Sequence, residues 1–181
     1  MEPVVTTSAL VLHNLGLAAG FGGSLFGKFS LAPAMGAIED KQERSRVMDV
    51  AWNSYKWVNA ASIGSVAITW FAGRRMMSGR VISPGARRLV IAKDVLLVTS
   101  LASTTANIFL GRALGNLQPP LDAHGRPAPE ASAKAASLQR VVSVLGTVNL
   151  ICAAGLIGIT SWLNNKAASS FRWNLVSRML P

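Results

Sequence analysis

The chain contains few charged residues and few of the side chains that carry out chemistry. Charged residues make up 14% of its 181 residues, and only eight are Asp or Glu, whereas about 25% of residues are charged in an ordinary soluble domain. The single cysteine, Cys152, excludes an intrachain disulfide and a C-x-x-C motif. No nucleophile–base–acid set, phosphate-binding loop or pair of carboxylates is present. The sequence therefore predicts no catalytic residue and favours a non-enzymatic protein over an enzyme.

Four long apolar stretches dominate what is present. Residues 3–27, 57–73, 95–111 and 141–165 contain no Asp, Glu, Lys or Arg. A helix that spans a bilayer needs about 20 predominantly apolar residues. The sequence therefore predicts an all-α fold, an integral membrane four-helix transmembrane bundle. We expect it to form a single domain over residues 1–181, with spans at about 8–31, 52–73, 89–110 and 138–163.

The connecting segments carry their own signals. We expect Pro33 to close the first span, and Trp52 and Tyr55 to lie at the membrane interface as part of an aromatic belt. The loop between the third and fourth spans is rich in proline, which favours extended chain over packed structure. In the tail, residues 167–180, three apolar side chains spaced four apart predict a short C-terminal interfacial helix: Phe171, Leu175 and Met179. A frayed terminus is the alternative.

Basic residues far outnumber acidic ones and give a net charge of +10. In a soluble protein this charge would suggest nucleic acid, but here Lys and Arg mostly flank the apolar spans. The predicted partners are therefore anionic lipid headgroups, and no nucleic acid. The densest acid-free cluster lies between the second and third spans and contains Arg74, Arg75, Arg80, Arg87 and Arg88. The total number of Lys and Arg is the same on the two sides, and this dense cluster breaks the tie, which predicts that both termini are cytoplasmic.

A glycine stripe runs along the first apolar stretch. Its members are spaced four, three and four apart, which places them on one helical face: Gly16, Gly20, Gly23 and Gly27. Small residues at this spacing let two helices approach closely in lipid. The stripe therefore predicts a tight helix–helix seam. The alternative is that the glycines clear space for a flat cofactor or a lipid.

His13 precedes Gly16 by three residues and joins this face. A histidine beside a glycine-lined seam can ligate the iron of a haem or the metal of another macrocycle, or it can hydrogen-bond to a neighbouring helix. The chain has one other histidine, His124, which lies in the proline-rich loop. A haem held by two histidines is therefore excluded, and His13 would be the single histidine ligand of a haem. No zinc site is predicted, because zinc needs three or four protein ligands.

Each span also carries asparagine, and we single out one per span: Asn14, Asn59, Asn107 and Asn149. They predict hydrogen bonds between helices, with a polar pathway or a small-ligand pocket as the alternative. Lys93 and Asp94 lie about one turn inside the Arg87–Arg88 end of the third span. We expect Lys93 to extend its ammonium group to the membrane interface, which costs less than burying the charge.

The first span contains the pattern Gly22-Gly23-x-x-Phe26-x-x-Phe29-x-x-Ala32-Pro33. This pattern resembles the first helix of several uncharacterised bacterial four-helix membrane families and is similar to that of the anthrone-oxygenase-like four-helix membrane proteins. The resemblance implies a four-helix membrane fold, and we expect a bacterial inner membrane as the location. It also implies an enzyme acting on a lipophilic substrate as one alternative function, but it carries over no catalytic residue.

Together these observations favour a non-enzymatic membrane protein, an accessory or structural subunit of a larger membrane complex whose partners are other membrane protein subunits. One alternative is a redox subunit that binds haem, a pigment or a quinone through His13. Another is a small-solute transporter or channel that works as an oligomer.

Overall fold

The computed structural model describes residues 2–77 and 84–179, with the side chains of residues 8–73 and 87–165. Almost all of this chain is helical, and the elements in order are α1 (Glu2–Phe26), η1 (Gly27–Leu31), α2 (Ala32–Ala34), η2 (Met35–Ala37), α3 (Lys41–Met77), α4 (Pro84–Leu117) and α5 (Ala133–Met179). The fold is all-α, and the four long helices α1, α3, α4 and α5 pack together.

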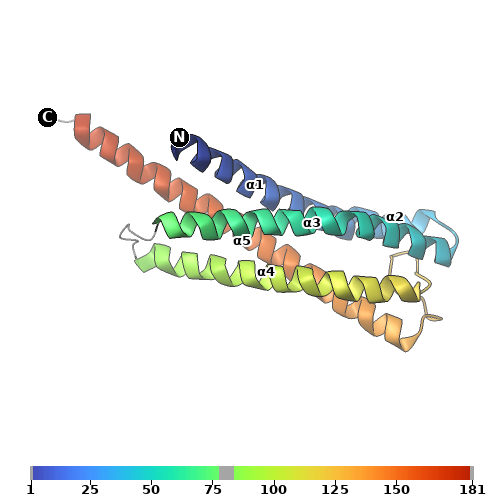
Figure 1. Cartoon of the computed structure of the whole chain (residues 1–181). Coiled ribbons are helices and arrows are strands. Elements are labelled where there is room, and N and C mark those ends of the chain that lie inside the picture. The colour runs from blue at the N-terminus through green and yellow to red at the C-terminus, as the bar shows by residue number, and fades with distance from the viewer. Residues whose placement is uncertain (1, 78–83, 180–181) are drawn as a thin grey trace.

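The four long helices run roughly along one axis and form two pairs (Figure 1). α1 packs mainly against α3, and α4 packs mainly against α5, with smaller contacts between α1 and α5 and between α3 and α4. Both ends of the chain lie at the same end of the bundle as the end of α3 and the start of α4 (Figure 1). α5 crosses the bundle and continues beyond it towards the C-terminus (Figure 1).

Within the described residues, three segments are long and apolar enough to cross a membrane, namely Ser8–Ala37, Arg87–Leu117 and Ala133–Asn165. These three helices indicate an integral membrane protein. The span expected at residues 52–73 is not among them. The charge-free part of α3, residues 57–73, contains Asn59, Ser62 and Ser65, which lower its hydropathy.

The sequence predicts that Pro33 closes the first span, but in the structure the helix continues past this proline. The chain stays helical to Ala37 by changing its hydrogen-bond pattern around the proline. Residues Gly27–Leu31 form a π-helix, and the backbone N–H of Ala32 donates to the carbonyl of Gly27. Because Pro33 has no N–H to donate, the widened turn lets the helix pass the proline instead of stopping there.

The tail is continuous with α5, so it is not the separate short helix that the sequence suggested. α5 contains a single run of helical residues from Ala133 to Met179, with no break near residue 166. The predicted apolar face of the tail lies outside the described side chains. Because the backbone of the tail follows the axis of α5 (Figure 1), the tail is an extension of the last span.

The proline-rich loop is folded rather than extended. Leu121 packs with Met35 and Met48 in a small core at this end of the bundle, and its N–H donates to the carbonyl of Lys41 at 3.1 Å. Arg44 binds the carbonyls of Ile38 and Leu121 at 2.7 and 3.2 Å. The loop therefore closes the end of the bundle as a cap, which is defined here as residues 118–132.

Candidate functional site

A cluster of polar side chains lies inside the bundle near the Arg87–Arg88 end. Lys93 of α4 is its centre and is only 2% exposed. Its Nζ atom lies 3.0 Å from Nε2 of His13 on α1 and donates a 2.7 Å hydrogen bond to Oγ1 of Thr160 on α5. The expectation that Lys93 extends to the interface is therefore wrong, because its neighbours supply acceptors inside the bundle.

His13 is buried, and both of its ring nitrogens have protein partners. Nδ1 lies 2.8 Å from Oγ1 of Thr69, and Thr69 in turn donates to the carbonyl of Ser65 at 2.7 Å. An ammonium group can only donate, so Lys93 as an ammonium makes Nε2 the acceptor and leaves the ring hydrogen on Nδ1. Neither nitrogen is free for a haem iron without breaking one of these bonds.

Trp70 of α3 connects the two adjacent charged residues of α4. The Nζ atom of Lys93 lies 4.1 Å from the centre of the Trp70 ring, a cation–π contact. The indole N–H of Trp70 donates to Oδ1 of Asp94 at 2.8 Å. All four long helices therefore contribute a side chain to this cluster, and the ammonium group has a partner on three of them.

The glycine stripe lies in the seam between α1 and α3. A Cβ atom on Gly16 would overlap Ser65, and one on Gly27 would overlap the Trp52 ring. A Cβ on Gly23 would overlap Tyr55.

The Tyr55 hydroxyl donates to the carbonyls of Ala19 and Gly20 at 3.1 and 2.9 Å. Around Gly20 the fit is looser, since a Cβ there would make ordinary contacts with Ser62 and Asn59. The space that the glycines leave is thus occupied by side chains of α3, including the two aromatic residues that we expected at the membrane interface.

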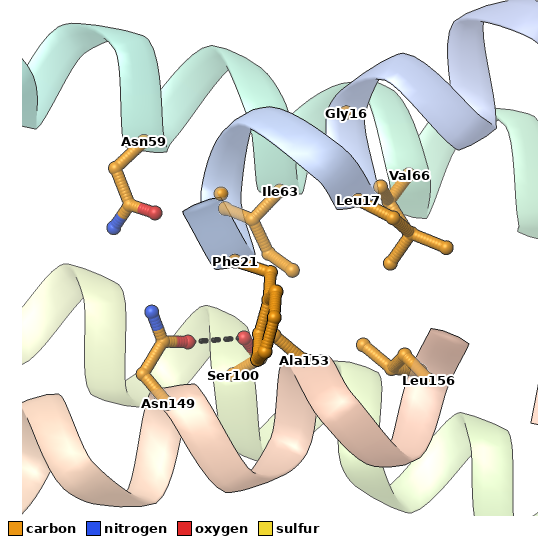
Figure 2. Close-up of a pocket in the computed structure, with 11 residues that line it drawn as sticks. Gly16, Leu17, Phe21, Asn59, Ile63, Val66, Ser100, Asn149, Ala153 and Leu156 are labelled. Atoms are coloured by element: carbon orange, nitrogen blue, oxygen red, sulfur yellow. Dashed lines mark hydrogen bonds between the residues drawn. The ribbon is translucent and has the colours of Figure 1, made fainter. Parts of the chain in front are cut away.

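A small cavity of about 20 Å³ lies at the middle of the bundle. All four long helices line it, and Figure 2 shows Asn59 and Asn149 pointing towards one another across it. Ser100 donates to Oδ1 of Asn149. A cavity of this size holds about one water molecule, so it has room for neither a solute nor a quinone.

The other two predicted asparagines lie elsewhere. Asn14 is exposed on the outer face of α1. Asn107 is half-buried on α4, where its Oδ1 atom is buried without a hydrogen-bond partner, and so is the Oγ1 atom of Thr104 one turn away. The four asparagines therefore do not come together, and only Asn59 and Asn149 face each other.

The predicted basic cluster falls partly outside the described residues. Arg80 and the side chains of Arg74 and Arg75 are outside them, whereas Arg87 and Arg88 are exposed at the start of α4. Among the side chains of residues 8–73 and 87–165, no group of three or more His, Cys, Asp and Glu residues could hold a metal ion.

Two carboxylates, those of Asp122 and Glu130, form hydrogen bonds that hold the cap together. The carboxylate of Asp122 accepts hydrogen bonds from the backbone N–H groups of His124 and Arg126, both at 2.8 Å. Partial burial acts to raise the pKa of Asp122, but these amide donors outweigh it and hold the pKa below its ordinary value. At the cap's edge, Lys41 pairs with Glu130 at 2.7 Å, and this hydrogen bond lowers the pKa of Glu130.

Sequence reasoning missed the Lys93 cluster, although a signal was present. Lys93, Leu97, Ser100 and Thr104 are spaced four, three and four apart and are all buried on α4. That spacing places Lys93 on the inward face of the helix rather than at its exposed edge.

Three apolar helices packed with a fourth around a buried polar cluster define the class: a helical integral membrane protein. Comparison of the chain with protein-family models, with curated proteins and with solved structures finds no match. The function is therefore argued from the residues alone.

Proposed function

We propose that this chain is a non-enzymatic integral membrane protein with four spans, and that it serves as an accessory or structural subunit of a larger membrane complex. The fourth span is α3. Its Val66 and Trp70 are buried in one core with Leu17 of α1, Leu97 of α4 and Leu156 of α5. Because α3 packs against three apolar spans in this core, we infer that it spans the bilayer with them.

The observation that carries the proposal is the outer face of α1. Asn14, Ala18 and Gly22 are exposed and spaced four apart, and a Cβ on Gly22 would meet no atom within 4 Å. In hydrocarbon an exposed amide is costly, and small residues at this spacing favour a closely packed helix. This face therefore suits a helix of another subunit.

α1 and α4 both expose large apolar side chains, on α1 at Val11, Leu15 and Leu25, but between residues 89 and 110 α4 exposes no asparagine or glycine. Its exposed residues in the span include Ile91, Val95, Val98 and Phe109, which are 52–66% exposed. Large aliphatic and aromatic side chains suit lipid tails. The exposed Asn14 and Gly22 therefore distinguish α1 from α4 and support a partner on α1.

The interior supports a role without a bound cofactor. Trp52 and Tyr55 fill the glycine seam, and both nitrogens of His13 are hydrogen-bonded. At the bundle end, Arg87 and Arg88 are exposed and suit anionic headgroups. We place this end and both termini in the cytoplasm, and the bundle in a bacterial inner membrane.

Gentle detergent extraction from the native membrane, followed by native mass measurement, tests the proposal. We expect the wild-type chain to run with other subunits at a mass well above its own 19.1 kDa. Gly22→Ile should release a folded single chain, because the larger side chain blocks close approach of a helix. Ala102→Ile, a matched change at an exposed position of α4, should leave the complex intact. A wild-type chain that runs alone, or only with copies of itself, would contradict the proposal.

A further inference from the structure

We propose that His13 and Lys93 form a proton-binding site inside the membrane, in which the two side chains share a single positive charge. This inference goes beyond the accessory role and does not depend on it. It rests on the geometry of the pair, on the neutral groups around it, and on an apolar layer that closes it on one side.

The pair is enclosed by groups that stabilise one ammonium group. Nζ of Lys93 has His13 Nε2 at 3.0 Å, Thr160 Oγ1 at 2.7 Å and the Trp70 ring centre at 4.1 Å. These three partners come from α1, α5 and α3, and each offers an acceptor or a π-face. The contacts of Nζ among the described side chains are therefore with neutral groups, which compensate one positive charge.

The charged and titratable groups around the pair are few in the described part of the chain. α1 contributes His13, and α4 contributes Lys93 and Asp94, whose carboxylate accepts from Trp70. α3 and α5 present Thr69, Trp70 and Thr160 to the pair, and these are neutral. Further along these two helices, the side chains of Arg74, Arg75 and Lys166 lie outside the described residues.

Two protonated groups cannot occupy this site together. An imidazolium ring and an ammonium group 3.0 Å apart would repel strongly in a low-dielectric interior. With Lys93 as the ammonium, Nε2 of His13 accepts and Nδ1 donates to Thr69. Moving the proton breaks one N–H bond on Nζ and forms one on Nε2. That transfer leaves a neutral amine and an imidazolium, so the charge moves from α4 to α1.

An apolar layer closes the site towards the middle of the bundle. One helical turn from each member of the cluster, the same helix places a buried aliphatic residue: Leu17 after His13, Val66 before Trp70, Leu97 after Lys93 and Leu156 before Thr160. The cavity between Asn59 and Asn149 lies beyond this layer (Figure 2). The proton therefore exchanges towards the Arg87–Arg88 end.

The experiment is ¹⁵N NMR of the full chain in phospholipid nanodiscs, with labelled histidine. The chain has two histidines, and His124 is exposed in the cap, so it serves as an internal reference. We expect His13 to carry one ring hydrogen, on Nδ1, and to keep that form at a mildly acidic pH at which the histidine of a labelled model peptide is an imidazolium. Labelling lysine as well should show a hydrogen bond between Lys93 Nζ and His13 Nε2.

Lys93→Met provides the matched test, with Lys28→Met as its control. Lys28 also binds a helix other than its own, through a 2.7 Å bond to Thr147, but it is exposed. We expect Lys93→Met to let His13 become an imidazolium at that mildly acidic pH, and Lys28→Met to leave His13 unchanged. A wild-type His13 that is doubly protonated while Nζ of Lys93 is also an ammonium group, or that lacks the bond to Lys93, overturns the proposal. The protonation of His13 and its bond to Lys93 are both measured in the wild-type chain, so they test the proposal even if Lys93→Met does not fold.

Discussion

The ammonium nitrogen of Lys93 lies 4.1 Å from the centre of the Trp70 ring, while the indole N–H of the same ring donates to Asp94 at 2.8 Å. One side chain of α3 thus holds two adjacent charged residues of α4, one by its face and one by its edge. The direct contact between α3 and α4 is otherwise small compared with their contacts to α1 and α5. Trp70 is therefore a polar link between these two helices.

Substitutions of Trp70 separate its two roles. Trp70→Phe keeps a ring beneath Lys93 but removes the hydrogen bond to Asp94, and should lower the free energy of unfolding by about 1–3 kcal/mol. Trp70→Leu also removes the cation–π contact, which is worth about 2 kcal/mol in a desolvated setting, and should cost correspondingly more. Unfolding in mixed micelles with increasing denaturing detergent measures both. Equal losses in the two variants would show that the ring face contributes nothing.

A double-mutant cycle measures the coupling between His13 and Lys93. His13→Leu leaves the buried ammonium without one of its acceptors, so it should cost about 1.5–3 kcal/mol, the range for a hydrogen bond to a charged group. In the Lys93→Met background the same change should cost much less, because no buried charge remains to be satisfied. Detergent unfolding of the four proteins gives the interaction energy. Additive losses would mean that the pair is not coupled.

Two neighbouring glycines should respond oppositely to alanine. Gly23→Ala places a Cβ inside the space of the Tyr55 ring, so α1 and α3 must move apart, and overpacking of this kind costs about 1–3 kcal/mol. Gly22→Ala meets no atom within 4 Å and should leave the unfolding free energy of the isolated chain unchanged or slightly raised. The comparison uses purified single chains, so that partner subunits do not contribute. Similar destabilisation by both changes would place the seam on a different face of α1.

The cap should loosen in acid. The pKa of Asp122 is lower in the folded cap than its ordinary value of 3.8. Its stabilising contribution is therefore present above about that pH and is lost as the pH falls through the depressed folded pKa. Hydrogen exchange of the His124 and Arg126 amides should quicken over that interval. In Asp122→Asn these amides should exchange faster at neutral pH and show no such acid-dependent step, and a persistent step would assign the transition to another group.

Much of the fold could be predicted because membrane spans and close helix contacts leave local patterns. The glycine spacing placed Gly16, Gly23 and Gly27 on one face, and these residues do lie against α3. Three of the four predicted spans coincide with apolar helices of sufficient length. The span predicted at residues 52–73 of α3 is not among these helices, since its inward Asn59, Ser62 and Ser65 reduce its hydropathy while they serve the packing.

The cluster and the cap could not be predicted from local patterns, because both depend on which helices meet. A lysine near a helix end extends to the interface unless other helices supply acceptors, and for Lys93 these come from residues 80 and 67 positions away in the sequence. The prolines of the cap indicated a loop but not its partners, since Leu121 is held by Lys41 and packs on Met35 and Met48.

Photo-crosslinking from defined positions in the native membrane tests the central claim, that the outer face of α1 binds another subunit. A photoreactive amino acid at Ala18 on the outer face of α1 is compared with the same residue at Ala102 on the outer face of α4, since both positions are exposed. We predict that position 18 crosslinks to a distinct membrane protein and that position 102 crosslinks only to lipid. Crosslinks from position 18 to lipid alone, or only to a second copy of this chain, would contradict the account.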